Sequence, residues 1–201
     1  TQKFYNWYAV NGVYDNASFS DPSLRKQFAP SGWRVATWAD VQNLGSYLNP
    51  NQNNSSNVTV AEDIGKAMSS VNGWNYSSYI DSPGNDSASN NESGFNAIPN
   101  GFRTDANSNS TNAEGLQGFY GNGSYAIFWI SDEDFKTYNT FYQSNDLHHG
   151  SQNNKWSGYS VRFVRDTNSS DTNPPTISGD GSVFVDENQT AVSTYSASED
   201  V

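Results

Sequence analysis

Residues 29–50 read APSGWRVATWADVQNLGSYLNP, and this stretch decides how the fold is built. Its proline and glycine predict a turn, after which residues 33–36 form a short strand. Thr37 is a good helix N-cap, and Asp40 three positions later partly completes a capping box. Apolar residues then fall on one helical face, namely Val41, Leu44 and Leu48. Asn49-Pro50 should end this helix, because proline cannot continue it.

The segments on either side of this stretch extend the pattern. Residues 1–10 are rich in aromatic side chains and predict a strand, which a turn at Asn11-Gly12 ends. Downstream, residues 60–71 predict a second helix. Its inward-facing residues are Ile64, Met68 and Val71.

From residue 72 to about residue 167, no segment has a convincing helical pattern. Short aromatic segments instead alternate with loops rich in Asn, Ser and Gly. They lie at 94–103, 117–120, 125–131, 137–142 and 159–165. In the last segment Tyr159, Val161 and Phe163 alternate with Ser160, Arg162 and Val164, as in a strand. The predicted fold class is therefore α+β, with two helices and a loop-rich antiparallel sheet.

Composition divides the chain into three parts. Residues 1–166 form the main domain, and residues 167–176 are a polar, proline-containing linker. Residues 177–201 predict new β structure, but so few strands cannot close a sandwich by themselves. We therefore expect the tail to be the partial start of a neighbouring β domain, and the chain to be a piece of a longer exported protein.

The charge and the missing cysteines narrow the classes of partner. The chain has 10 basic and 21 acidic residues, a formal net charge of -11. Nucleic acids and anionic membrane surfaces are poor partners, because binding them requires a basic face. Since no stretch approaches the ~20 apolar residues of a membrane span, no membrane insertion is expected. Without cysteine, disulfides and thiolate metal sites are excluded.

Some landmarks of the main domain occur in a characteristic order. They are YNWYAV at 5–10, APSGWRV at 29–35, SGFNAIPNGFR at 93–103 and GYSVRFVRD at 158–166. Together they resemble the Fibrobacter succinogenes major paralogous domain, a bacterial family placed with C-type-lectin-like folds. The resemblance implies a C-type-lectin-like fold for residues 1–166.

A narrower resemblance concerns the tail. Residues 179–188, GDGSVFVDEN, look like the start of the cadherin-like or immunoglobulin-like repeats of repeats-in-toxin adhesins. In such adhesins, a domain of this type captures C-terminal peptides of cell-surface proteins with a bound calcium ion. The resemblance implies a binding module at the extracellular surface of a bacterium, which acts in cell adhesion and biofilm formation and is no enzyme.

Oxygen-bearing side chains gather in two short segments, Ser-Asp-Glu-Asp at 131–134 and Gln-Ser-Asn-Asp at 143–146. Calcium takes about six to eight oxygens from carboxylates, amides, backbone and water. The predicted calcium ligands are Asp132, Asp134, Gln143, Asn145 and Asp146. The usual Trp-Asn-Asp triplet of C-type lectins is missing, and the alternative is an Asx-rich turn that holds no ion.

Other residues are candidates for contact with the ligand itself. Arg103 can bind a carboxylate through two hydrogen bonds, and Asp105 and Asn107 follow it at the alternate spacing of calcium loops. The alternative for Arg103 is a buried ion pair that holds the sheet. Trp129, Tyr142 and Trp156 can stack on a sugar or line a peptide pocket, and the alternative is that they belong to the core.

Enzymatic chemistry finds little support. Asp132 and Asp134 are the alternative of a carboxylate pair for glycoside hydrolysis, but they lie two residues apart among polar neighbours, which fits metal ligation better. His148 and His149 are expected in a solvated loop, since adjacent residues of a strand would point to opposite faces. No G-x-S-x-G nucleophile motif occurs. The formylglycine-generating oxidase, an enzyme of C-type-lectin-like folds, uses active-site cysteines that this chain lacks.

Three functions remain at this point. The leading one is calcium-dependent capture of a peptide through its free C-terminal carboxylate, a known mode of recognition. The second is calcium-dependent binding of sugars, whose paired hydroxyls would replace the carboxylate. The third is a structural spacer in which calcium only stiffens the protein.

Overall fold

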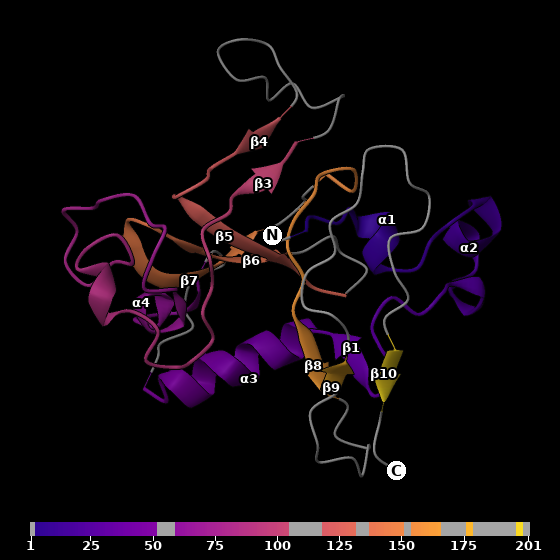
Figure 1. The fold of residues 1–201 in the computed structure, drawn as a ribbon, viewed down its shortest axis with the longest axis horizontal. Coiled ribbons are helices and arrows are strands. Elements are labelled where there is room, and N and C mark those ends of the chain that lie inside the picture. Colours follow the sequence, from indigo (N-terminus) through magenta and orange to yellow (C-terminus); the bar gives the residue numbers. More distant parts are fainter. Residues whose placement is uncertain are drawn as a thin grey trace. The chain divides into compact units, whose positions relative to one another are not determined.

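The computed structural model describes residues 3–51, 59–104, 118–131, 137–150 and 154–165, with the backbone of two short strands beyond them (Figure 1). The chain divides into two compact units, Thr1–Val164 and Arg165–Val201. In the second unit β9 (Thr176–Ser178) pairs antiparallel with β10 (Ser196–Ser198). The predicted linker at 167–176 lies outside the described residues except for Thr176, with which β9 begins.

A four-stranded antiparallel sheet forms the centre of the first unit, in the order β2-β7-β6-β5. Its strands are β2 (Thr59–Ala61), β5 (Tyr125–Trp129), β6 (Thr137–Phe141) and β7 (Ser144–Gly150). The predictions of strands at 125–131 and 137–142 are confirmed. Two smaller pairs join β1 (Trp33–Val35) to β8 (Phe163–Arg165) and β3 (Phe102–Arg103) to β4 (Phe119–Tyr120). Helices and antiparallel sheets together confirm the α+β class.

Helix α3 (Trp38–Leu48) begins and ends where the sequence predicts. The Thr37 side chain accepts a hydrogen bond from the Asp40 backbone, and the Asp40 side chain accepts one from the Thr37 backbone, which completes the capping box. Val41 is buried, and Leu44 and Leu48 pack against the same core cluster. The local signals sufficed here because each cap satisfies backbone groups of this helix alone.

The N-terminal segment differs from the prediction of a strand over 1–10. Trp7–Val10 form a short helix, α1, whose N-cap Asn6 accepts a hydrogen bond from the Ala9 backbone at 2.9 Å. Trp7 and Val10, three positions apart, are both buried on its inner side. The prediction was wrong because aromatic content alone does not distinguish a strand from a short amphipathic helix. Helix α2 (Asn16–Ser20) and the 3₁₀ helix η1 (Pro22–Leu24) follow.

The second predicted helix, over 60–71, is much shorter. Only Gly65–Met68 are helical, as α4, because residues 59–61 pair with β7 as the edge strand β2. Ile64 and Met68 are buried as expected, whereas Val71 is 39% exposed. Pairing with a distant strand therefore outweighed the local helical periodicity. A short 3₁₀ helix, η2 (Ser87–Ser89), lies in the long segment that follows.

Strand β7 lies where the sequence predicts loops. The segment around 143–149 was expected to be a calcium-binding loop and a solvated histidine loop, yet Ser144–Gly150 lie between β2 and β6 in the sheet. Only Leu147 is buried in this strand. The signal was missed because one inward apolar residue among polar ones gives no alternating pattern to recognise.

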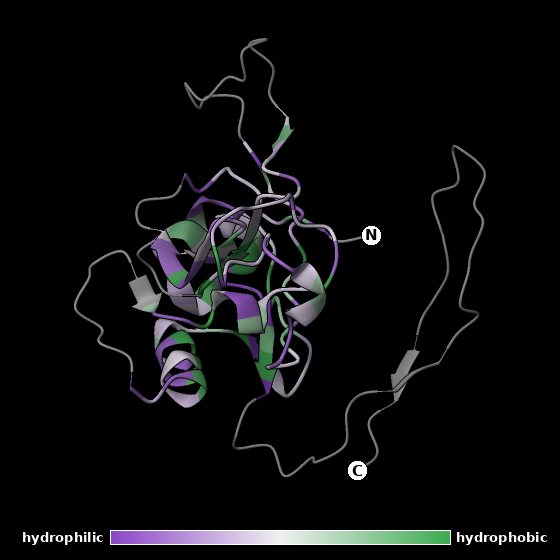
Figure 2. Ribbon diagram, turned by 90° about the vertical axis from the view of Figure 1, so that its left-hand side faces the viewer, coloured by the Kyte–Doolittle hydropathy of each residue, from purple (hydrophilic) through white to green (hydrophobic). Residues whose placement is uncertain are grey.

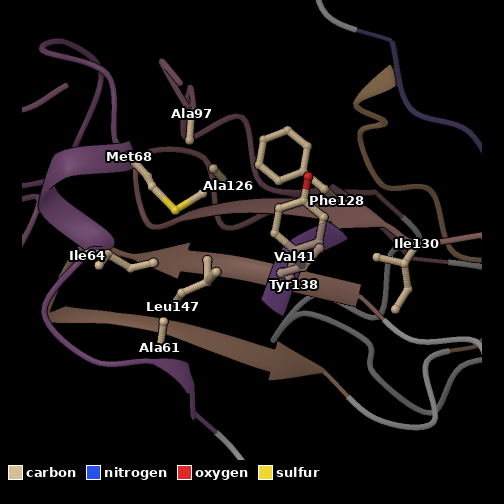
Figure 3. Packing of buried hydrophobic residues seen from close by; sticks show 10 residues of the cluster. All are labelled: Val41, Ala61, Ile64, Met68, Ala97, Ala126, Phe128, Ile130, Tyr138 and Leu147. Atoms are coloured by element: carbon tan, nitrogen blue, oxygen red, sulfur yellow. The ribbon is translucent and has the colours of Figure 1, made fainter. Parts of the chain in front are cut away.

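Two aromatic-rich clusters form the core, and Figure 2 shows hydrophobic segments inside this unit with hydrophilic ones around them. In the first cluster Ile64, which precedes α4, and Met68 within α4 point onto the sheet face that carries Leu147 and Tyr138 (Figure 3). The rings of Phe128 and Tyr138 stack with centroids 5.2 Å apart. The second cluster gathers Trp7, Val10, Val35, Trp129 and Tyr159.

A segment near the end of the unit closes the fold. Tyr159 exchanges backbone hydrogen bonds with Tyr5, and Gly158 exchanges two with Arg103. The Trp129 backbone N–H donates to Ser160, whose own N–H donates to Ile127. Gly158 suits this crossing, since a Cβ there would approach the Cβ atoms of Phe4 and Arg103 to 3.1 and 3.2 Å. Residues 158–160 thus join segments far apart in the sequence.

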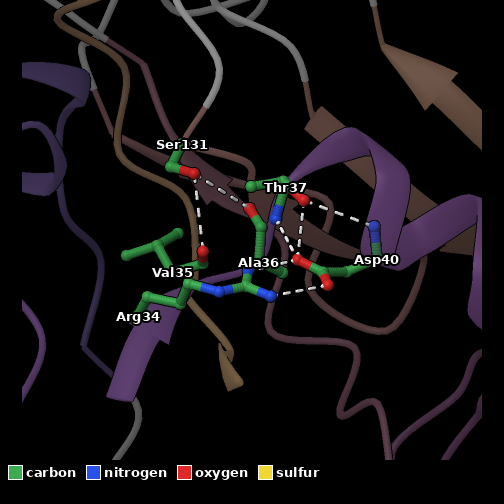
Figure 4. A network of polar contacts seen from close by, with 6 residues as sticks. All are labelled: Arg34, Val35, Ala36, Thr37, Asp40 and Ser131. Atoms are coloured by element: carbon green, nitrogen blue, oxygen red, sulfur yellow. Dashed lines mark hydrogen bonds and ion pairs between the residues drawn. The ribbon is translucent and has the colours of Figure 1, made fainter. Parts of the chain in front are cut away.

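A polar network fixes the start of α3 against β1 (Figure 4). Arg34 donates through Nη1 to Asp40 Oδ2 and through Nη2 to Asp40 Oδ1, the latter at 2.9 Å. Asp40 Oδ2 also accepts the Thr37 backbone N–H and the Thr37 hydroxyl, each at 2.7 Å. The Arg34 guanidinium and the Thr37 donors hold the pKa of Asp40 well below its ordinary value. The negative charge of Asp40 therefore stabilises the fold at neutral pH.

This network predicts an acid-dependent loss of stability. Because the folded pKa of Asp40 is depressed, its contribution is present above the unfolded pKa, near 3.8, and is lost as the pH falls towards the folded pKa. Asp40→Asn should lower the free energy of unfolding by about 1–2 kcal/mol at pH 7. The difference from the native protein should shrink below about pH 4, as measured by urea unfolding across the pH range.

Glu92→Gln, at an exposed position, changes the net charge by the same amount and serves as the matched control. It should leave stability near the native value at pH 7. A constant gap between Asp40→Asn and the native protein from pH 7 to pH 2 would contradict the role given to the Asp40 charge.

Candidate ligand-binding site

Two of the predicted calcium ligands, Asn145 and Asp146 on β7, form hydrogen bonds to a segment far away in the sequence. Asn145 Oδ1 accepts the Lys66 backbone N–H at 2.8 Å, and Asp146 Oδ1 accepts the Asp63 N–H at 3.3 Å. Gln143 lies in the turn between β6 and β7 and is half-buried. Asn145 and Asp146 therefore anchor the start of α4 to the sheet. Their side chains satisfy backbone N–H groups that have no partner within this short helix.

The approach of this segment to β7 is close. A Cβ on Gly65 would lie 2.8 Å from both the carbonyl carbon and the oxygen of Asn145, and 3.0 Å from the Asp146 oxygen. Only glycine avoids this overlap, because the nearby atoms belong to the backbone and cannot rotate away. Gly65 and Asn145 thus form one packing unit.

The other predicted calcium ligands, Asp132 and Asp134, lie outside the described residues. Their flanks do not approach Gln143: Trp129 pairs with Thr137 and Thr137 with Gly150 at one end of the sheet, whereas Tyr125, Phe141 and Ser144 pair at the other. Thr137 and Phe141 are four residue steps apart along β6, roughly 13 Å at about 3.3 Å a step. The structure does not bring the ends of the 132–136 segment next to the hairpin turn.

The described residues do not bring the predicted calcium ligands together. Among them, no group of three or more His, Cys, Asp or Glu side chains is placed to hold a metal. Calcium needs about six to eight converging oxygens, whereas Asn145 and Asp146 direct oxygens to two different backbone donors. Calcium binding stays a prediction.

The predicted ligand-contacting residues have different fates. Trp129 is fully buried and donates its indole N–H to the Tyr5 carbonyl at 2.7 Å, so it belongs to the core and cannot stack on a ligand. Tyr142 is half-buried and packs edge-on against Phe141. Trp156 is 55% exposed. Arg103 has an exposed side chain on β3, which does not fit a buried ion pair, while Asp105 and Asn107 lie outside the described residues.

The two histidines lie on β7. The His148 ring shares a hydrogen bond with the Ser144 hydroxyl at 2.8 Å, and burial lowers the pKa of His148. The His149 ring packs against Trp38 with centroids 4.7 Å apart. Both side chains therefore take part in the packing of the sheet, and the prediction of a solvated loop was wrong.

A different candidate site is a cavity of about 450 Å³. It lies beside residues 158–160, the closing segment of the unit. Its polar lining consists of Lys3, Tyr5, Asn96, Ser160 and Arg162, and its apolar lining of Ile98, Phe128, Val161 and Phe163. Among these described lining residues two are basic and none is acidic. In a chain of net charge -11, this cationic cavity is a local reversal of sign, and it favours an anionic ligand.

Arg162 is held in place before any ligand arrives. Its guanidinium lies over the rings of Phe95 and Phe128, 4.6 and 5.6 Å from their centroids. Its Nη2 donates to the carbonyls of Phe95 and Asn96 at 2.7 and 3.1 Å. A guanidinium carries several N–H donors in a fixed fork, so these contacts at Nη2 use only part of its capacity. A preorganised donor of this kind loses little entropy when it binds a carboxylate.

A second cavity, of about 400 Å³, shares Arg162 and Phe163 with the cationic cavity. Most of its lining is apolar and includes Val41 and Leu44 of α3 and Phe95, but the carboxylate of Asp40 also lines it. The shared residues place an apolar space next to the cationic one. Neither Lys3 nor Arg162 was among the candidates from sequence. The sequence signal for Arg162 was its position in the predicted strand at 159–165, where it alternates with Val161 and Phe163.

The part of the chain that the structure describes contains no helix long and apolar enough to cross a membrane. The model of one protein family, described as the Fibrobacter succinogenes major domain, matches residues 1–165. No curated protein and no solved structure matches the chain.

The role of Asn145 is open to a direct test. Asn145→Ala removes the acceptor for the Lys66 N–H and should lower the free energy of unfolding by about 1–2 kcal/mol. Gln143→Ala, in the hairpin turn, should change it by less than about 0.5 kcal/mol. Urea unfolding of both variants, each with calcium and with chelator, makes the comparison. Equal stability of Asn145→Ala and the native protein under both conditions would contradict the anchoring role.

Proposed function

The chain belongs to the Fibrobacter succinogenes major domain family, and we propose that it is a non-enzymatic binding module that captures the free C-terminal carboxylate of a peptide. The observation that carries this proposal is the cationic cavity, in which Lys3 and Arg162 stand without an acidic neighbour among the described lining residues. Because the rest of the chain carries net negative charge, an anion would bind preferentially in this cavity.

The mixed lining favours a peptide end over a small inorganic anion. A C-terminal residue carries its carboxylate and its side chain on the same carbon, so it needs a cation and an apolar wall close together. Arg162 and Lys3 provide the cations, while Ile98, Val161 and Phe163 provide the wall. Ser160 and Asn96 add polar groups that can pair with the terminal backbone amide.

The neighbouring apolar cavity extends the same site. Since it shares Arg162 and Phe163 with the cationic cavity, a peptide with its carboxylate at Arg162 could place an upstream apolar side chain against Leu44 and Phe95. Capture of chain ends by preorganised donors is an established form of peptide recognition. In this arrangement the protein's own cations hold the carboxylate, and calcium is not needed at that contact.

The biological setting extends the proposal. The tail sequence at 179–188 resembles adhesin repeats, and the absence of cysteine with an acidic, Asn- and Ser-rich composition suits an exported surface protein. We therefore place the module on a bacterial cell surface, where it would bind the exposed C termini of other surface proteins and so contribute to adhesion.

Paired peptides test this function. A library of short peptides is offered once as free acids and once as C-terminal amides, and titration calorimetry measures the affinity of each hit. Amidation removes the charge and should weaken binding by about 1.5–3 kcal/mol, roughly ten- to 150-fold. Affinities should agree in calcium and in chelator. Equal binding of both peptide forms would remove the carboxylate mechanism, and binding only in calcium would assign the carboxylate to a metal.

Two charge reversals locate the contact. Lys3→Glu, at an exposed position in the cationic cavity, should weaken free-acid peptides at least tenfold and leave the fold intact. Lys26→Glu makes the same change of charge beside Tyr14, outside that lining, and should have little effect. Arg162→Lys keeps the charge but loses the fork geometry, so an intermediate loss is expected. Equal effects of the two reversals would indicate general electrostatics only.

A further inference from the structure

A third cavity, of about 390 Å³, lies between α1, α2 and the turn at 154–156. Its lining is dominated by aromatic side chains, namely Tyr8, Tyr14, Phe19 and Trp156. Three of them are unusually open to solvent, with exposures of 55% for Tyr14, 47% for Phe19 and 55% for Trp156. Exposed aromatic rings gathered in one concavity are costly in water and mark a binding surface.

The rings are held in fixed positions by the backbone around them. The Trp7 N–H donates to the Lys155 carbonyl at 3.0 Å, which joins α1 to the 154–156 turn. The Trp156 N–H donates to Asn154 Oδ1 at 3.1 Å, and the Trp156 ring lies 4.7 Å from that of Tyr8. Helix α2 presents Phe19, whose ring is 6.3 Å from Tyr8. The cavity is therefore formed before a ligand binds.

Polar groups complete the lining at the start of α2. Asp15 and Asn16 contribute a carboxylate and an amide. Asp15 Oδ1 caps α2 by accepting the Ser18 N–H at 2.8 Å and the Ser18 hydroxyl at 2.7 Å. These bonds from Ser18 lower the pKa of Asp15, so it is charged at neutral pH. A carboxylate has several acceptor positions on its two oxygens, so Asp15 can accept further hydrogen bonds from a ligand.

The charge of this lining is opposite to that of the cationic cavity. Its described residues include one acid and no base. Lys26 and Lys155 contact the faces of Tyr14 and Phe19 at 4.2 and 4.9 Å, but neither belongs to the lining. These lysines offset the charge of Asp15, so the lining itself offers mainly aromatic faces, one carboxylate and one amide. A ligand that fits this lining presents C–H faces to aromatic rings and carries hydroxyls for Asp15 and Asn16.

A neutral carbohydrate has this combination of properties. We propose that Tyr8, Phe19 and Trp156 form a saccharide-binding site that works without calcium, in which a sugar ring stacks on the aromatic side chains and its hydroxyls bond to Asp15 and Asn16. This site is separate from the peptide cavity and does not depend on the proposed peptide function. The protein would then hold two ligands of different chemistry.

A panel of neutral sugars tests the proposal on the native chain. Glucose, galactose, mannose, N-acetylglucosamine and their β-linked disaccharides are titrated in calcium and in chelator, with saturation-transfer NMR as the readout. At least one sugar should bind equally in both conditions. Binding by none of them, or binding abolished by chelator, would overturn the proposal.

Variants then locate the bound sugar. Trp156→Ala and Phe19→Ala, both at exposed positions, should weaken the sugar at least tenfold, while Trp156→Phe should keep part of the affinity. Tyr47→Ala removes an aromatic ring that is 81% exposed on α3 and should change nothing. Lys3→Glu should leave sugar affinity unaltered, which separates this site from the peptide cavity. Unchanged sugar binding in both Trp156→Ala and Phe19→Ala would overturn the assignment.

Discussion

The backbone pairing of residues 158–160 is the constraint on which the rest of the first unit depends. This segment bonds to Tyr5 on one side, to Arg103 on another and to β5 through Ile127 and Trp129. The Trp129 indole also donates to the Tyr5 carbonyl, so the two ends of the unit and its central sheet meet at one place. Such non-local pairing has an entropic cost, and burial of the aromatic core around Trp7, Trp129 and Tyr159 helps to offset it.

Both proposed sites lie at the borders of this closing segment. Arg162 follows it and lines the cationic cavity, while Trp156 precedes it and lines the aromatic cavity. The backbone bonds of residues 155–162 fix both side chains to the core, because Trp7 bonds to Lys155 and Ala36 to Arg162. The backbone bonds of this one segment therefore position both the cationic cavity and the aromatic cavity. A ligand that binds at either cavity would meet preorganised groups and would not have to order a loop.

A chain without cysteine must fix its long irregular segments by other means. Lys66 donates through Nζ to the carbonyls of Ser82, Asn85 and Asp86, and burial lowers its pKa. Its ammonium thus fastens the segment around η2 to α4, while Asn145 and Asp146 fasten α4 to the sheet. The backbone adopts left-handed conformations at Asp81, Asp86 and Asn91 in the same region, which short polar side chains tolerate best. Polar contacts between distant segments thus do in this chain what disulfides do in many small secreted domains.

The sequence by itself determined the elements whose stabilising contacts are local. Patterns a few residues long predict the capping box of Thr37 and Asp40, the apolar face of α3, the turn at Asn11-Gly12 and the strands β5 and β6. Only the tertiary structure decided that residues 59–61 pair with β7, that 144–150 form a strand, and that Asn145 caps a backbone segment far away in the chain. The cationic cavity is also a product of the tertiary structure, because no local pattern around Arg162 predicts that Lys3 and Asn96 line the same cavity. The physical reason is that hydrogen-bond caps and side-chain periodicity act within one element, whereas strand pairing and cavity lining depend on which distant segments the core brings together.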